Sequence, residues 1–333
     1  MNFLILWTWM SFFCQMHCLE PTTLGLGAIG AAIGSYWWYK RDVYCYTYDS
    51  EKVHQTARNL TFTLSKAIFG QHLVTKMVTN SLKSHLLKET PRKALVLSFH
   101  GFPGTGKNYV AKFIADAMYP DTGLKNPHFH LIISTIHFPI PSQSYEYKSQ
   151  VQNWIKGNIT NCQRSVFVFD EVDKMPPNVI DGIKPFIDFH EDIDGIDFRK
   201  AIFIFLGNTG AKKINERVNE LSSQGTKRED ISYEALESLV SKGAFNEDGG
   251  LKKSNIIGQH LVDHYIPFLP LERKHVRMCI EKELGDRNEN LPDSKIIQIL
   301  NSLNYWPDRI NGPFCTSGCK MISKKIDIML MDG

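Results

Sequence analysis

Three short apolar runs of the kind that forms buried strands mark the middle of the chain. They comprise residues 95–99, 166–169 and 201–206. After the first run, apolar residues recur at helical spacing, with Val110, Phe113 and Ile114 on one stripe. Alternation of strands and helices over this part of the chain predicts an α/β fold with a parallel sheet covered on both faces.

Two apolar stretches lie before this region. Residues 3–14 are too short to span a bilayer and read as a secretory signal, which we expect to occupy residues 1–20. Residues 24–39 are rich in Gly and Ala, end in aromatic residues and are at the lower limit of length for a span. We therefore expect residues 21–40 to associate with the membrane surface by dipping into or lying along one leaflet. A true span, or one long uncleaved signal anchor made of both stretches, are the alternatives.

Length and charge indicate how many domains the chain can form and which partners are not expected. The 333 residues allow a large core and a smaller second domain. The net charge is +3, the charges are mixed along the chain, and no basic run marks a nucleic-acid surface. Nucleic acid is therefore not expected as a partner.

The cysteines and two sequons indicate a compartment. Of the seven cysteines, Cys14 and Cys18 are expected to leave with the signal, and the other five have no zinc-type spacing with histidines. In a lumenal chain the default is disulfides, with an odd thiol left over. The sequons at Asn59 and Asn158 agree with a glycosylating compartment, although such triplets also arise by chance.

A glycine-rich segment after the first apolar run carries the strongest chemical signal. It fits the P-loop pattern, in which backbone N–H groups surround phosphate oxygens and a lysine reaches the β- and γ-phosphates. Its predicted nucleotide-binding residues are Gly101, Phe102, Pro103, Gly104, Thr105, Gly106, Lys107 and Asn108. Asn108 replaces the usual Ser or Thr, and its amide oxygen is a weaker ligand for Mg²⁺. The position between strand and helix suits the motif, because the helix N-terminus favours anions.

Polar residues follow the second and third apolar runs. These are the positions at which an ATP site needs groups that bind the metal and activate water. Asp170 and Glu171 end the second run and fit a Walker B pair, in which Asp170 holds Mg²⁺ directly or through water and Glu171 activates the attacking water. Asn208 follows the third run and could orient that water or touch the γ-phosphate. An ordinary acidic turn and a turn-forming Asn are the alternative interpretations.

In this order the three elements resemble an AAA+ ATPase, and in detail they resemble the torsins, Clp-type ATPases of the ER lumen and nuclear envelope. Asn after the P-loop lysine is characteristic of that family. The likeness runs from about Pro21 to the C-terminus. Further torsin-like strings lie at residues 69–72, 170–175, 183–186, 203–208, 267–271 and 318–320.

The resemblance implies an architecture and roles for individual residues. We expect an AAA+ nucleotide-binding domain at residues 41–265 and a small, mainly helical lid domain at 266–333. ATP and Mg²⁺ are the implied cofactors. The implied roles are phosphate binding for Lys107, metal binding for Asp170 and Asn108, catalysis for Glu171, sensor 1 for Asn208 and sensor 2 for Lys320.

Torsins also carry disulfides, which here would pair Cys279 with Cys319 at sensor 2 and Cys45 with Cys162. Reduction of the first would free the sensor segment, so redox sensing is a hypothesis. Cys315, four residues from Cys319, could compete for Cys279.

Two features of Clp-type relatives are missing. Residues 268–271 contain no arginine where those relatives place a finger that reaches the neighbouring subunit's γ-phosphate. Arg273 and Arg277 lie close by, but solvated positions on a lid helix are the simpler interpretation. The glycine-flanked aromatic pore loop is also missing, because Tyr145-Glu146-Tyr147 has no glycines beside it, which makes polypeptide threading doubtful.

The missing arginine predicts an ATPase that is weak alone. The resemblance to torsins implies a chaperone-like remodeller of proteins or membranes in the ER lumen and perinuclear space. Torsin activators, the lumenal domains of lamina-associated polypeptide and its ER relative, have an AAA+-like fold and supply an arginine. By resemblance we expect such a partner here, and self-association into homo-oligomers. The alternative is a non-hydrolysing switch in which ATP binding assembles a complex.

Overall fold

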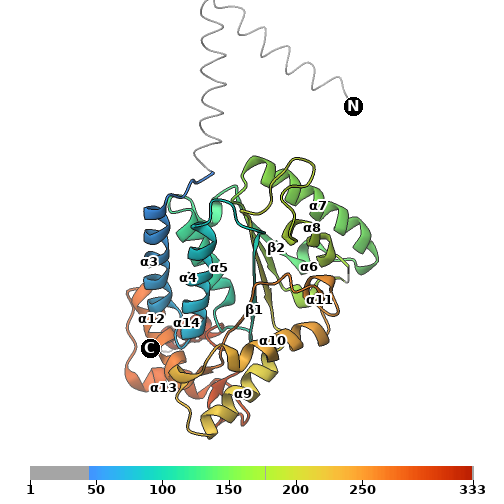
Figure 1. Cartoon of the computed structure of the whole chain (residues 1–333). Helices are drawn as coiled ribbons and strands as arrows, with labels where there is room; N and C mark the ends of the chain where they lie inside the picture. The colour runs from blue at the N-terminus through green and yellow to red at the C-terminus, as the bar shows by residue number, and fades with distance from the viewer. Residues whose placement is uncertain (1–44, 177, 332–333) are drawn as a thin grey trace, which may run out of the picture. The chain divides into compact units, whose positions relative to one another are not determined.

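The computed structural model of the protein describes residues 45–176 and 178–331 (Figure 1). The predicted signal and the segment 21–40 lie outside these residues. The chain divides into two units, Met1–Cys45 and Tyr46–Gly333, and every described helix and strand belongs to the second.

A five-stranded sheet forms the centre of this unit, in the order β2-β3-β4-β1-β5 with every pairing parallel. Its strands are β1 (Leu95–His100), β2 (Phe129–Ile133), β3 (Val166–Asp170), β4 (Ile202–Gly207) and β5 (His264–Pro267). The predicted parallel sheet is confirmed, and β3 and β4 are neighbours as expected.

Both faces of the sheet are buried, which explains why its strands read as continuous apolar runs. Because side chains alternate along a strand, Leu95, Leu97 and Phe99 of β1 join one core while Val96 joins the other. The first core is covered by α3 (Ser50–Ala67), α4 (His72–Leu86) and α5 (Lys107–Met118). The second is covered by α7 (Ser144–Asn161), α9 (Ala211–Ser223) and α10 (Glu234–Asn246).

Short elements connect these layers. The helices are α6 (Ser134–His137), α8 (Lys184–Ile187) and α11 (Asn255–Gly258). The 3₁₀ turns are η1 (Gly123–Lys125), η2 (Pro141–Gln143), η3 (Val172–Lys174), η4 (Ile180–Gly182) and η5 (Arg228–Asp230).

The C-terminal part has a core of its own, in which Val276, Ile280, Ile299 and Ile326 are buried together. Its elements are β6 (Leu271–Glu272), α12 (Arg273–Asp286), α13 (Asp293–Asn301), β7 (Tyr305–Trp306), β8 (Phe314–Cys315) and α14 (Ile322–Met331). The three short strands form an antiparallel sheet, β6-β8-β7. In Figure 1, α12, α13 and α14 gather beside the lower ends of α3 and α4.

The domain boundary expected between residues 265 and 266 stays a prediction. It falls inside β5, which pairs with β1 through Pro267. The elements that share the C-terminal core begin at Leu271. The apolar residues of β5 run directly into those of the linker, residues 268–270, so hydrophobicity alone gave no signal for the boundary.

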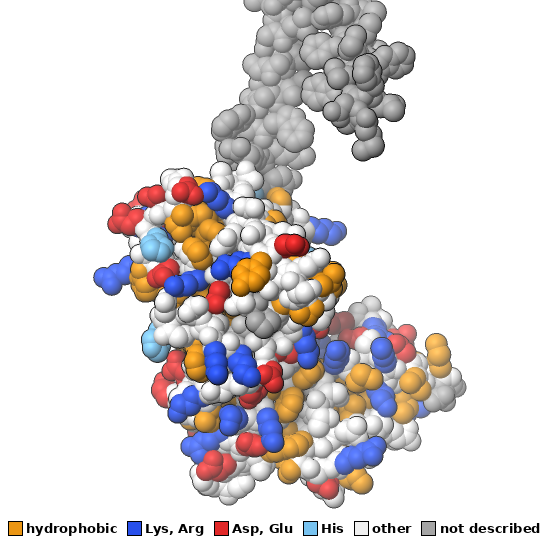
Figure 2. Space-filling view, turned by 90° about the vertical axis from the view of Figure 1, so that its right-hand side faces the viewer, with side chains coloured by type: hydrophobic (Ala, Val, Ile, Leu, Met, Phe, Trp, Pro, Cys, Tyr) orange, Lys and Arg blue, Asp and Glu red, His pale blue; other side chains and the backbone are white. Residues whose placement is uncertain are grey.

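The described surface is mixed in charge. Figure 2 shows acidic and basic side chains interspersed over the face turned to the viewer. Within residues 45–331, no helix is both long enough and apolar enough to cross a membrane.

Candidate nucleotide site

The P-loop joins β1 to α5 at the carboxyl edge of the sheet, where ligands of open parallel sheets bind. Gly104 and Gly106 have φ of +77° and +108°, conformations that residues with a Cβ rarely adopt. Gly106 is also the N-cap of α5, so the first N–H groups of the helix follow directly on the loop. Both the sharp turn and the helix N-terminus therefore favour a bound phosphate.

Lys107 lies buried in this loop and is held by oxygen acceptors. Its Nζ donates to the carbonyls of Gly101 (2.5 Å) and Phe102 (3.1 Å) and to Oδ1 of Asn208 (3.0 Å). Burial lowers the pKa of Lys107 to about 8, against the raising effect of Asp173 and Asp170. A triphosphate beside this ammonium would favour its charged form.

The carboxylates predicted from the second strand meet the P-loop from the other side. The Asn108 side-chain amide donates to Oδ2 of Asp170 at 2.6 Å. The backbone N–H of Glu171 donates to Oδ1 of Asp170, and Oγ1 of Thr135 donates to Oε2 of Glu171 at 2.5 Å. Glu171 has a left-handed backbone, with φ of 55°, which turns the chain sharply after β3.

These residues fit the needs of Mg²⁺, which takes one or two carboxylates together with substrate phosphates. Asp170 is the carboxylate ligand that this arrangement offers, and Asn108 lies against it. Among the described residues, no cluster of three or more His, Cys, Asp or Glu side chains could hold a metal without the phosphates.

Asn208 stands at the end of β4 and joins the lysine to a further carboxylate. Its backbone and side-chain N–H groups donate to Asp173, at 3.2 and 3.4 Å. Asp173 therefore fixes the amide whose oxygen faces Lys107. Sequence reasoning gave Asp173 no role, although its position three residues after Asp170 was a signal that could have indicated one.

A buried histidine under the loop was also missed. His100 ends β1, and its ring pairs with Oγ of Ser98 (2.7 Å) and with the carbonyl of Thr209 (3.0 Å). Burial lowers its pKa to about 4, so the ring is neutral at physiological pH. It ties the start of the P-loop to the residue after Asn208.

The C-terminal part touches the P-loop directly. The backbone N–H of Cys319 donates to the carbonyl of Gly104 at 3.0 Å. A Cβ on Gly104 would lie 2.0 Å from the carbonyl oxygen of Ser317, and one on Gly318 would lie 2.3 Å from the oxygen of Gly104. The glycines are thus required for close approach of two backbones, which brings Lys320 to the site.

Cys279 and Cys319 form a disulfide with Cα atoms 6.1 Å apart, which ties this turn to α12. Cys315 is buried and free. Cys45 and Cys162 are each disulfide-bonded, and the pairing of Cys45 with Cys162 stays a prediction.

The walls enclose a cavity of about 630 Å³. Its lining brings together the P-loop from Pro103 to Asn108, both Walker B carboxylates, Asn208 and Lys320. The end of α3 and the two residues after it contribute Ala67, Ile68 and Phe69, and α12 contributes Cys279, Lys282, Glu283 and Asp286. The structure thus gathers in one place the phosphate, metal, catalytic and sensor residues expected from the sequence. Gly101 and Phe102 lie just behind, as acceptors for Lys107.

Arginine is not found among the described residues that line the cavity. Arg273 stacks on Tyr305 at 3.9 Å and donates to Asn301 and to the carbonyl of Ile310. Arg277 is paired with Glu281 and Asp293. Both side chains are engaged within the C-terminal part.

The remaining predicted positions lie away from the cavity. Asn59 is exposed on α3, and Asn158 is half-buried on α7, where its amide donates to the carbonyl of Trp154. Tyr145 is 76% exposed at the start of α7, whereas Tyr147 is buried in the core. Glycosylation at the two asparagines stays a prediction.

Fold and site together define an AAA+ ATPase, a class whose members use ATP with Mg²⁺. Structures of Hsp104 are similar in fold. One, in a closed state with ATPγS and casein, has a TM-score of 0.57 at 18% identity, covering 84% of this chain and 47% of that one. The Saccharomyces cerevisiae Hsp104–ADP complex has a TM-score of 0.56 at 19% identity, covering 84% and 49%. The chain thus spans about half the length of these Hsp104 chains.

Closer relatives define the family. The torsin family model matches residues 43–169, and that of the torsin-1A C-terminal domain matches residues 271–329. A torsin-like protein of Caenorhabditis elegans is 40% identical over 306 residues, covering 90% of this chain and 85% of its own. One of Drosophila melanogaster is 38% identical over 323 residues, covering 93% and 92%. The chain belongs to the torsin family, and the resemblance drawn from the motifs is confirmed.

Proposed function

We propose that this torsin is an activator-dependent ATPase that remodels proteins or membranes in the ER lumen and perinuclear space. The observation that carries the proposal is a phosphate site furnished with Lys107, Asp170, Glu171 and Asn208 whose described lining includes no arginine. An arginine finger accelerates hydrolysis by about 10³–10⁵ in other nucleotide hydrolases. The lumenal domain of a lamina-associated-polypeptide-like membrane protein is the proposed source of that charge.

Each residue then has a definite task. Lys107 binds the β- and γ-phosphates, Asp170 and Asn108 hold Mg²⁺, and Glu171 accepts a proton from the attacking water. Mg²⁺, when bound, would neutralise negative charge on the phosphates. Asn208 positions the water or the γ-phosphate as sensor 1, and Lys320 contacts the γ-phosphate as sensor 2.

The test is the steady-state ATPase rate of the protein with and without such a lumenal partner. We expect little turnover alone and strong stimulation by the partner. A partner whose arginine is changed to alanine should bind without stimulating. Robust turnover by the protein alone would defeat the proposal.

A non-hydrolysing assembly switch is the second candidate. Asn108 in the place of a hydroxyl ligand favours it, as does the hydrogen bond that holds Glu171 to Thr135. If hydrolysis normally releases the partner, Glu171→Gln should trap an ATP-bound complex. If that variant exchanges partners like wild type, the switch is the better description.

Redox sensing at the C-terminal turn is a further part of the proposal. The Cys279–Cys319 disulfide lies one backbone hydrogen bond from the P-loop. Reduction would loosen the turn that carries Lys320 and so weaken nucleotide binding. Association with the membrane through residues 24–39, glycosylation and homo-oligomer formation, which is usual among AAA+ proteins, complete the proposed picture.

A further inference from the structure

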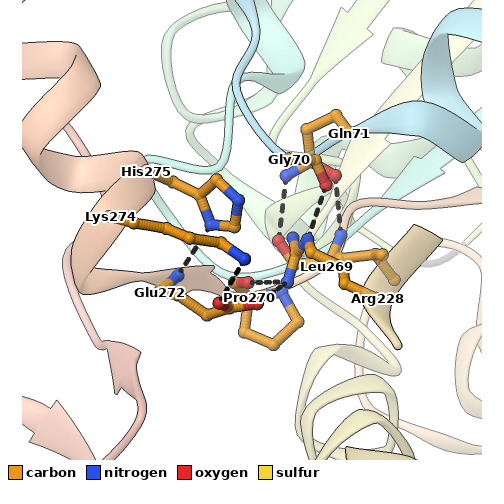
Figure 3. A network of polar contacts seen from close by, with 8 residues as sticks. All are labelled: Gly70, Gln71, Arg228, Leu269, Pro270, Glu272, Lys274 and His275. Carbon is orange, nitrogen blue, oxygen red and sulfur yellow. Dashed lines mark hydrogen bonds and ion pairs between the residues drawn. The ribbon is translucent and has the colours of Figure 1, made fainter. Parts of the chain in front are cut away.

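A second polar network surrounds the linker between β5 and the C-terminal part (Figure 3). Gln71 joins this network to the P-loop. Gln71 is 2% exposed, and both the nitrogen and the oxygen of its side-chain amide are hydrogen-bonded. Nε2 donates to the carbonyl of Thr105 in the P-loop (3.2 Å) and to that of Leu269 in the linker (2.9 Å). Oε1 accepts the backbone N–H of Leu269 at 2.9 Å. One side chain thus binds the phosphate loop and both backbone polar groups of a linker residue.

Arg228 holds the other side of the same linker. Its guanidinium donates to the carbonyls of Gly70 and Pro270, both at 2.9 Å, and to Glu272 at 3.2 Å. Figure 3 shows Arg228 beside Gly70, Gln71 and the linker residues. Because its side chain is only 5% exposed, these contacts are shielded from water.

A histidine of the C-terminal part completes the network. His275, in the first turn of α12, accepts the N–H of Glu272 at 3.1 Å. Its ring lies so close to Gly70 that a Cβ there would be 2.7 Å from Nε2. The segment Gly70–Gln71, the linker and the first turn of α12 are therefore joined by one set of hydrogen bonds and close contacts.

We propose that Gln71 is a positioning residue that couples the P-loop to the linker, so that nucleotide binding reorients the C-terminal domain. Gln71 is not among the described residues that line the cavity, so it acts through Thr105 and Leu269. The inference rests on the proposed nucleotide binding and deepens it. Couplings of this type change affinities by about 5- to 150-fold and act in both directions.

Glutamine suits this task for a chemical reason. The linker carbonyl and the P-loop carbonyl both need a donor, and the linker N–H needs an acceptor. A glutamate could serve only the N–H and would place a charge against two carbonyls, while a methionine of similar length would serve none of them.

The experiment measures backbone hydrogen exchange of the full chain, nucleotide-free and with ATPγS, in residues 271–329. We expect ATPγS to slow exchange there in wild type. In Gln71→Met, ATPγS should still bind, but its effect on the C-terminal residues should be lost. Gln55→Met, at an exposed glutamine on α3, is the matched control and should respond like wild type.

The possible outcomes distinguish a failure of the Gln71 coupling from a failure of the proposed nucleotide binding. A Gln71→Met variant that binds ATPγS and keeps the wild-type response would overturn the coupling alone, since a merely structural glutamine would lower stability without changing that response. Wild type that binds ATPγS with no response would overturn it too. Wild type that does not bind ATPγS would overturn the proposed function and the coupling together.

A second variant guards against loss of folding. Arg228→Lys keeps a positive charge near Glu272 but cannot reach the Gly70 and Pro270 carbonyls together. We expect it to reduce the ATPγS response of residues 271–329 while the protein stays folded. An unchanged response in this variant would contradict the role of the network.

Discussion

The two walls of the nucleotide cavity are held in place by different means. The phosphate wall consists of residues that follow the ends of neighbouring parallel strands, where Lys107 donates to Asn208 and Asn208 donates to Asp173. The opposite wall consists of α12 residues and a turn at residues 316–320. A disulfide ties this turn to α12, and backbone hydrogen bonds tie it to Gly104 and to Asn304. Folding of the sheet therefore fixes the first wall, whereas a reducible bond contributes to holding the second.

The largest expected effect comes from the phosphate wall. Glu171→Gln removes the base that accepts the proton from water, and general-base catalysis contributes about 10²–10⁴ in rate. We expect partner-stimulated turnover to fall by that factor while ATP binding stays. Rapid-quench hydrolysis assays would measure the loss, and Glu216→Gln, at an exposed glutamate on α9, is the control.

Removal of the disulfide should break the second wall alone. Closing a loop of 40 residues contributes roughly 4 kcal/mol in the chain-entropy model. The double variant Cys279→Ser, Cys319→Ser should therefore destabilise the C-terminal part, as followed by hydrogen exchange of residues 271–329. Exchange over β1, β3 and β4 should be unaffected. Cys315→Ser is the control, and equal destabilisation in it would argue against the disulfide as the cause.

Lys107→Ala removes the positive charge of the phosphate wall. Loss of the ammonium should weaken ATP binding about a hundredfold, or about 2.7 kcal/mol. Titration with a fluorescent ATP analogue would measure it. Lys112→Ala, at an exposed lysine on the same helix, should bind like wild type. If the two variants bind ATP equally well, Lys107 has no part in the site.

Acid should weaken the phosphate wall through His100. Its pKa is lowered to about 4 by burial, so the neutral ring contributes stability that is complete above pH 6.5 and is lost as the pH falls toward 4. The loss at pH 5 is about 2 kcal/mol in the free energy of unfolding. Urea unfolding at several pH values would show a flatter profile for His100→Gln. A profile unchanged by that substitution would mean that His100 does not carry the effect.

Sequence patterns were sufficient for the parts of the site that local chemistry determines. The P-loop, Asp170 with Glu171, and Asn208 each follow an apolar run, so their meeting at one sheet edge could be predicted. Thr135 and Gln71 could not be assigned, because their roles depend on partners far away in the chain. Gln71, for example, bonds to Leu269 across 198 residues, and no local pattern marks such a pairing.

The domain boundary shows a second limit. Residues 265–267 of β5 and the linker after them, residues 268–270, are apolar because the strand is buried in the sheet and the linker is buried between the two parts. Only the pairing of β5 with β1 separates them. The C-terminal strands, each two residues long, likewise give no periodic signal.

The most direct test of the account is single-turnover hydrolysis of ATP already bound to the protein, because it isolates chemistry from nucleotide exchange. The account predicts that bound ATP persists on the protein alone and is hydrolysed about 10³–10⁵ times faster once an arginine-bearing lumenal partner is added. Fast hydrolysis without any partner would contradict it.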